Sequence, residues 1–124
     1  MENFKEDVEF QCHFFELLAT KCNDDLLVLQ RLGAIYSTLG RTEDSLRTDI
    51  RASFVAPENP TVHYNLACSF ALTGQPQFAI SHLRLAVQLG FDDLEQIRTD
   101  GDLLPLRNLP DFQRIVEELQ QNRQ

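Results

Sequence analysis

Residues 26–57 read LLVLQRLGAIYSTLGRTEDSLRTDIRASFVAP, and residues 60–90 read PTVHYNLACSFALTGQPQFAISHLRLAVQLG. The two stretches align when one is shifted by 34 residues along the chain. Seven pairs of positions then agree in residue type: Leu32/Leu66, Gly33/Ala67, Tyr36/Phe70, Gly40/Gly74, Ser45/Ala79, Leu46/Ile80 and Ala52/Ala86. Self-similarity at a fixed period of this length is the signature of a repeat architecture.

Each copy divides at its glycine into two helical stretches. We expect helices over about 26–39, 42–56, 60–73 and 76–89, because these stretches lie between turn and cap signals. Asn59 can cap a helix that opens with Pro60, since proline suits a first turn whose N–H has no partner. Thr42 is the expected cap after Gly40, and Gly74 can adopt the left-handed turn that ends a helix. No alternating strand-like run occurs in the sequence, so the predicted fold class is all-α.

The segments on either side of the repeats also predict helices. Residues 1–25 predict one helix over about 4–22, and residues 92–124 predict a closing segment. That segment begins with a short helix capped by Asp92 or Asp93, continues through an irregular stretch, and ends in a helix from about Pro110. The irregular stretch is expected to be anchored by Leu103, Leu104 and Leu106. We expect a single domain with four parts: residues 1–25, 26–59, 60–91 and 92–124.

Composition and charge exclude several classes of function. The chain has 124 residues, of which 43% are hydrophobic, and a formal net charge of −8. The acidic residues concentrate in 1–25 (net −5) and 92–124 (net −4), and no basic stripe offsets them, so nucleic acid and anionic membranes are not expected partners. No apolar run approaches the roughly 18–20 residues of a membrane span, and the acidic start argues against a presequence. The expected compartment is the cytoplasm.

The chemistry that an enzyme or metal protein needs is missing from the sequence. Cys12, Cys22 and Cys68 are odd in number and have no metal-ligand spacing, so we expect free thiols and no metal. Neither a glycine-rich phosphate loop nor a Gly-x-Ser-x-Gly motif occurs. The neighbours Cys12-His13 and Ser81-His82 point about 100° apart on a helix and do not form a nucleophile–base pair. The prediction is a non-catalytic protein without a cofactor.

The two copies resemble the tetratricopeptide repeat (TPR), a helix-turn-helix unit of 34 residues. The residues that carry the resemblance are Leu32-Gly33, Tyr36, Ala52 and Pro57 in the first copy, and Leu66-Ala67, Phe70, Ala79 and Ala86 in the second. Asp49 departs from the pattern, which prefers a large residue there, and Phe91 replaces the usual closing proline. The resemblance implies a short right-handed α-solenoid, with an N-terminal helix before the pairs and a C-terminal capping helix after them.

The resemblance also implies a concave groove, lined by the first helix of each pair, that binds a peptide or helix of another protein. Carried over position by position, its lining is Leu27, Gln30, Arg31, Ala34, Thr38, Tyr64, Asn65, Cys68 and Leu72. For Tyr64 and Leu72, packing against the flanking segments is the alternative reading. Arg31 is the groove's basic residue and no lysine accompanies it, so the family's clamp for C-terminal carboxylates is not expected.

The N-terminal helix predicts a second surface. Phe4, Val8, Cys12, Phe15, Ala19 and Cys22 follow one stripe, whereas Phe10, Phe14 and Leu17 form another on roughly the opposite side. Two interpretations remain open: the closing segment or the curvature of the chain covers Phe10 and Phe14, or the stripe is a dimer or partner interface. The leading functional hypothesis is a protein-interaction module. The alternatives are a small chaperone that shields an aggregation-prone partner and a self-assembling scaffold piece.

Overall fold

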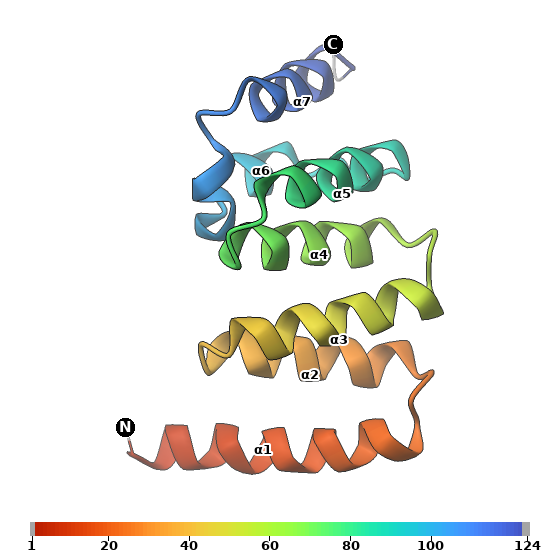
Figure 1. Ribbon diagram of the computed structural model, residues 1–124, viewed down its shortest axis with the longest axis vertical. Helices are drawn as coiled ribbons and strands as arrows, with labels where there is room; N and C mark the ends of the chain where they lie inside the picture. The colour runs from red at the N-terminus through yellow and green to blue at the C-terminus, as the bar shows by residue number, and fades with distance from the viewer. Residues whose placement is uncertain (1, 123–124) are drawn as a thin grey trace. The chain divides into compact units, whose positions relative to one another are not determined.

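The computed structural model describes residues 2–122 and is built of helices (Figure 1). The elements in chain order are α1 (Glu2–Lys21), α2 (Leu26–Thr38), α3 (Thr42–Val55), α4 (Pro60–Leu72), α5 (Pro76–Gln88), α6 (Leu94–Thr99), the 3-10 helix η1 (Gly101–Leu106) and α7 (Pro110–Asn122). No strand occurs within the described residues, and the prediction of an all-α fold is confirmed. No helix in residues 2–122 has the length and apolar character to cross a membrane.

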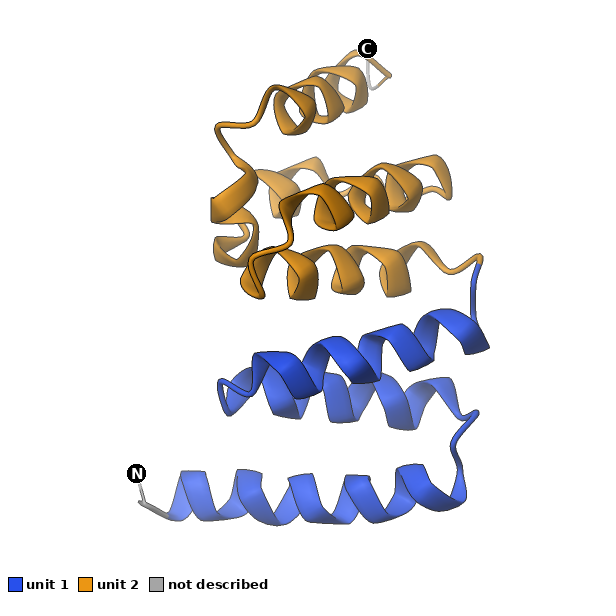
Figure 2. Cartoon of the chain, in the orientation of Figure 1, with its two compact units in different colours: residues 1–57 blue, residues 58–124 orange. Residues whose placement is uncertain are grey.

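The chain divides into two compact units (Figure 2). Unit 1 runs from Met1 to Pro57 and holds α1, α2 and α3, while unit 2 runs from Glu58 to Gln124 and holds the remaining helices. The division falls at the boundary between the two sequence repeats. The single-domain organisation and the right-handed superhelix stay predictions.

The core of unit 1 lies where α1 packs against α2. Its buried residues are Val8, Cys12 and Ala19 of α1 with Val28, Leu32, Ile35 and Tyr36 of α2. Phe4 belongs to the same stripe of α1 but is 66% exposed. The reason is length, because α1 has 20 residues and α2 has 13, so the first turns of α1 extend beyond their partner.

Gly33 of α2 lies against side chains of α3. A Cβ atom added at this position would lie 2.9 Å from Oδ1 of the buried Asp49. The Ser45 hydroxyl donates a hydrogen bond to the Gly33 carbonyl at 3.3 Å. The absence of a side chain at Gly33 therefore leaves room for the Asp49 carboxylate of α3.

The helix ends follow the sequence signals with one exception. Asn59 Oδ1 accepts hydrogen bonds from the backbone N–H groups of Thr61 (2.9 Å) and Val62 (3.2 Å), as expected of a cap. Gly40 and Gly74 have φ angles of 73° and 74°, which is the left-handed conformation predicted for the turns. The prediction of Thr42 as a cap is wrong, because α3 already includes Thr42 and the residue at the cap position is Arg41, whose side chain forms no capping hydrogen bond with the helix backbone.

The core of unit 2 is larger and includes the closing segment. Buried residues of α4 and α5, such as Ala67 and Leu83, pack with Leu103 and Leu106 of η1 and with Ile115 of α7. Each of these five side chains is at most 2% exposed. The closing segment is thus part of the interior of unit 2.

The expected role of Leu104 as an anchor is wrong. The stretch that contains it is a 3-10 helix, whose three residues per turn place positions i and i+3 on one face. Leu103 and Leu106 are on the buried face and Leu104, between them, is 63% exposed.

Candidate protein-binding site

A pocket of about 470 Å³ lies on the side of unit 1 where α1 meets the start of α2. It is lined by Phe15 of α1 and by Leu27, Val28, Gln30, Arg31 and Ala34 of α2. Positions 27, 30, 31 and 34 are spaced by three and four residues, so they share one face of the helix. The structure therefore brings together four of the five groove residues that the sequence predicts in this unit.

The pocket offers an apolar surface beside a cation. Leu27 is 78% exposed, Ala34 is also exposed, and Phe15 and Gln30 are half-buried. Among residues 2–122 the ion pairs involve His13, Arg41, Arg47 and Arg114, so the exposed Arg31 keeps its guanidinium for another group. A carboxylate next to an apolar side chain is the chemistry that complements this arrangement.

The sequence did not predict the wall of the pocket that α1 forms, and the place of Thr38 in the groove stays a prediction. Phe15 was expected on the stripe of α1 that packs against the rest of the chain. It lies at the edge of the core between α1 and α2, and it also lines the pocket. No pattern within α2 could reveal the contribution of α1. Thr38 lies beyond the pocket, where its hydroxyl donates a hydrogen bond to the Ala34 carbonyl at 3.0 Å.

Polar contacts at the other end of unit 1 fix α1 against α2. The Tyr36 hydroxyl donates a 2.5 Å hydrogen bond to Glu16, and the Arg41 guanidinium lies 4.7 Å from the centre of the Tyr36 ring. Arg41 also pairs with Asp44, with 2.8 Å between Nε and Oδ2. Burial and the hydrogen bond to Glu16 raise the pKa of Tyr36, so its hydroxyl remains a donor. These contacts hold the two helices that form the pocket in a fixed register.

In unit 2, Tyr64 and Cys68 lie in the interior, and their prediction as groove residues is corrected. Tyr64 is 2% exposed and stacks on Phe91 with 4.2 Å between ring centres. Its hydroxyl donates a 2.7 Å hydrogen bond to Asp100, and the Cys68 thiol lies 3.8 Å from the same carboxylate oxygen. The physical reason is that the closing segment covers this end of α4, so a partner does not reach either side chain. Of the other predicted residues in unit 2, Asn65 is half-buried and Leu72 is 40% exposed.

Cys68, Asp100 and Asp102 bring their potential ligand atoms within 4.8 Å of one another. Both oxygens of Asp100 already accept hydrogen bonds, one from the Tyr64 hydroxyl and the other from the backbone N–H of Asp102 at 3.0 Å. Burial, followed by the charge of Asp100, raises the pKa of the Cys68 thiol, which keeps it protonated. This cluster caps the start of η1 and ties it to α4.

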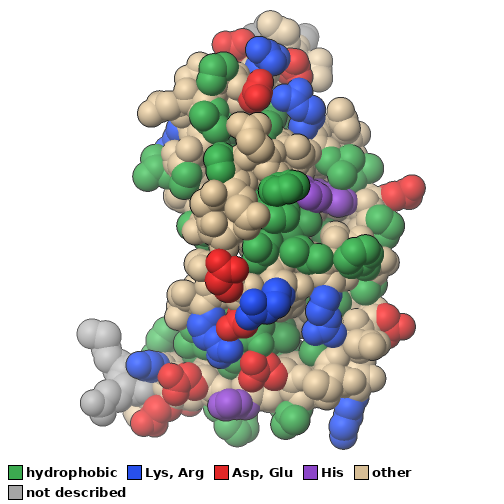
Figure 3. Space-filling model, viewed as in Figure 1, with side chains coloured by type: hydrophobic (Ala, Val, Ile, Leu, Met, Phe, Trp, Pro, Cys, Tyr) green, Lys and Arg blue, Asp and Glu red, His purple; other side chains and the backbone are tan. Residues whose placement is uncertain are grey.

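The second stripe of α1 is uncovered in the structure. Phe10 is 74% exposed, Phe14 is 49% exposed and Leu17 is 67% exposed. Hydrophobic side chains project from this helix in the space-filling view (Figure 3). Within unit 1, therefore, no other helix covers Phe10, Phe14 and Leu17, and the interface interpretation stays a prediction.

Three comparisons with known proteins were made, and the one with solved structures bears on the fold. The sequence matches no family model. It is 32% identical over 95 residues to a chloroplast protein of Arabidopsis thaliana; the match covers 74% of this chain but 28% of that relative's length. The structure is similar to the type III secretion translocator chaperone SycD of Yersinia enterocolitica, with a TM-score of 0.63 and 16% identity over 99% of this chain and 86% of that one. The chain has an all-helical fold that is similar to the fold of this solved structure.

A histidine pair joins α4 to α5 in unit 2. Nδ1 of His63 and Nδ1 of His82 are 3.1 Å apart, a hydrogen-bond distance that requires one nitrogen to donate and the other to accept. The rings are stacked, and His82 also stacks on Phe70. Burial, and then the charge of His63, lower the pKa of His82 below its ordinary value. The folded chain therefore favours the neutral form of His82.

We expect the stability of unit 2 to decrease in mild acid because of His82. The unfolded chain binds the proton more readily, so this contribution is complete above about pH 6.5 and is lost as the pH falls below that value. Urea unfolding at about pH 7.5 and about pH 5 measures the loss, which is expected to be smaller in His82→Gln than in the wild type. His13→Gln is the matched control, since the His13 side chain is 82% exposed. If the wild type and His82→Gln lose the same unfolding free energy between the two pH values, His82 is not the cause of the decrease.

Proposed function

We propose that the chain is a non-catalytic TPR protein that binds a segment of another protein in the pocket between α1 and α2. The observation that carries the proposal is this pocket, in which the 78% exposed Leu27 lies beside Arg31, which pairs with no acid within residues 2–122. Apolar area supplies affinity, and a guanidinium selects a carboxylate and its orientation. The proposed occupant is a peptide or helix with an apolar side chain next to an acidic residue.

Photo-crosslinking tests this proposal in cells that make the protein. A benzophenone amino acid replaces Leu27 in one variant and Leu104 in a matched control, because both leucines are exposed and only Leu27 lines the pocket. We expect a discrete crosslinked partner at position 27, and its yield to fall about tenfold when Arg31→Glu is added, as the loss of one charge-assisted hydrogen bond implies. Equal crosslinking at positions 27 and 104, or no effect of Arg31→Glu, would contradict it.

A chaperone role is the finer form of the same proposal. The structural neighbour is described as a translocator chaperone, and the exposed apolar pocket suits a partner segment that would otherwise aggregate. The measurement is the solubility of the crosslinked partner alone and together with the chain. If the partner is soluble by itself, the chain binds it without acting as its chaperone. The cytoplasm stays the predicted compartment.

Self-association through α1 is a second candidate, favoured by the exposure of Phe10, Phe14 and Leu17. Spacings of four and three residues place these side chains on one side of the helix. We propose that this face, defined by these three residues, pairs with the same face of a second chain. The chain would then act as a scaffold whose pockets remain available to partners.

A further inference from the structure

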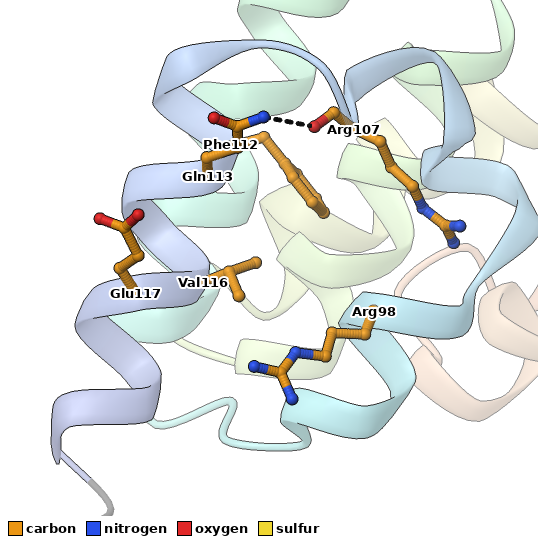
Figure 4. Close-up of a pocket in the computed structure, with 6 residues that line it drawn as sticks. All are labelled: Arg98, Arg107, Phe112, Gln113, Val116 and Glu117. Carbon is orange, nitrogen blue, oxygen red and sulfur yellow. Dashed lines mark hydrogen bonds between the residues drawn. The ribbon is translucent and has the colours of Figure 1, made fainter.

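Unit 2 contains a second cavity that the protein-binding site does not use. It has a volume of about 300 Å³ and lies between α6, the end of η1 and α7 (Figure 4). Its lining consists of Arg98, Arg107, Phe112, Gln113, Val116 and Glu117. We call it the C-terminal pocket. It lies wholly within unit 2, whereas the proposed protein-binding pocket lies in unit 1, so a ligand in one does not depend on a partner in the other.

The inner wall of the C-terminal pocket is apolar. Phe112 and Val116 are four residues apart on α7 and therefore share a face. Phe112 is buried at 5% exposure, and Val116 is half-buried beside it. The volume is at the lower end of the roughly 300–1,000 Å³ found for small-molecule sites. The pocket thus has room for a compact ligand with an apolar body.

Two guanidinium groups with unused hydrogen-bonding capacity line the same pocket. Arg107 Nη2 donates a hydrogen bond to the backbone carbonyl of Asp100 at 3.0 Å, but the buried Arg107 Nε has no acceptor. Arg98 Nη2 donates to the neutral amide oxygen of Gln120 at 2.8 Å. Neither arginine forms an ion pair within residues 2–122. The two arginines therefore bring positive charge to the pocket that no acid of the described residues neutralises, and an anion would complement it.

The acid that lines the pocket does not neutralise these arginines. The carboxylate of Glu117 points away from both guanidinium groups, toward the outer side of α7 (Figure 4). Arg114, on the same helix, is by contrast paired with Asp111, with 3.2 Å between Nη1 and Oδ1. Arg98 and Arg107 therefore differ from Arg114 in having no acidic partner among the described residues.

We propose that the C-terminal pocket binds a small carboxylic acid with an apolar body. Its carboxylate accepts hydrogen bonds from the exposed Arg98 and is attracted by the positive charge of Arg107, and its apolar part packs against Phe112 and Val116. Planar guanidinium groups match the geometry of a carboxylate, and the wall beside them excludes water from the rest of the ligand. Both parts of the ligand are needed for binding. Acetate, which lacks the apolar part, and a neutral amide, which lacks the charge, should therefore bind more weakly.

A two-dimensional NMR titration of the full chain with 3-phenylpropionate tests the proposal. We expect saturable shifts confined to residues near 98, 107, 112 and 116, with binding at least about tenfold weaker for the matched 3-phenylpropionamide and for acetate. Binding by the amide at equal strength, or the absence of saturable binding by the acid at about 10 mM, would overturn it, since ligands of this size reach millimolar affinity with ordinary efficiency.

Variants of the same residues assign the binding to the pocket. Arg98→Gln is expected to weaken binding of 3-phenylpropionate about tenfold without loss of folding, because Arg98 is exposed. Arg107→Gln should weaken it at least as much, whereas Glu117→Gln should strengthen it about twofold by removing a nearby negative charge. Arg114→Gln makes the same charge change on α7 outside the pocket and should leave the affinity unchanged. Equal weakening by Arg114→Gln and Arg98→Gln would show a general charge effect and overturn the assignment.

Discussion

Replacement of Leu103 by alanine is expected to lower the free energy of unfolding of unit 2 by about 2–5 kcal/mol. Leu103 is fully buried at 0% exposure, in a cluster that contains residues of α4, α5 and α7. Its removal leaves a cavity that the surrounding helices cannot close, because η1 is also tied to α4 by the hydrogen bond between Tyr64 and Asp100. Urea unfolding followed by circular dichroism measures the change.

Leu104→Ala is the matched control for this prediction. It makes the same chemical change one residue later, at a side chain that is 63% exposed, and we expect an effect within about 0.5 kcal/mol. A much larger loss of unfolding free energy for Leu103→Ala than for Leu104→Ala would show that the closing segment is part of the core of unit 2. Similar losses for the two variants would contradict the placement of Leu103 in the core and of Leu104 at the surface.

The local structure could be predicted from the sequence because each signal acts within a few residues. Asn59 before Pro60, and the glycines at 40 and 74, place helix ends through hydrogen bonds and backbone angles that neighbouring residues determine. The 34-residue period then predicts small buried residues at equivalent positions of the two copies, and Gly33 and Ala67 are both buried. Thr42 shows the limit of this reasoning, since a residue that suits a cap also fits the first turn of a helix.

The binding surfaces were less predictable because they combine elements that are distant in sequence. Phe15 lines the first pocket from another helix, and Asp100 covers Tyr64 from 36 positions later in the chain. A repeat alignment describes each copy as if its neighbours were further copies, and here the second copy is followed by a different closing segment. The same limit explains why the sequence did not indicate the pocket that Arg98 and Arg107 form with α7.

Phe10→Asp combined with Phe14→Asp is expected to convert a dimer of the wild-type chain into a folded monomer. Burial of the α1 face formed by Phe10, Phe14 and Leu17 would contribute roughly 4–8 kcal/mol before ordering costs, and two carboxylates on each chain would oppose it. The helix itself should persist, because these side chains are exposed and the core contacts of Val8, Cys12 and Ala19 are unchanged. Light scattering on a sizing column gives the molar mass, and circular dichroism checks the helix content.

Phe54→Asp with Phe78→Asp is the control for the α1 face. It removes two exposed phenylalanines, at 83% and 58% exposure, and adds the same charge away from α1, so the dimer should persist. Loss of the edge-to-face contact between Phe14 and Phe15, whose ring centres are 5.3 Å apart, costs the α1 variant about 0.5–1.5 kcal/mol, too little to unfold a typical domain. A monomeric wild type, or dissociation by the control variant as well, would exclude the α1 face as the site of self-association. A monomeric wild type would leave the pocket around Leu27 and Arg31 as the proposed protein-binding surface.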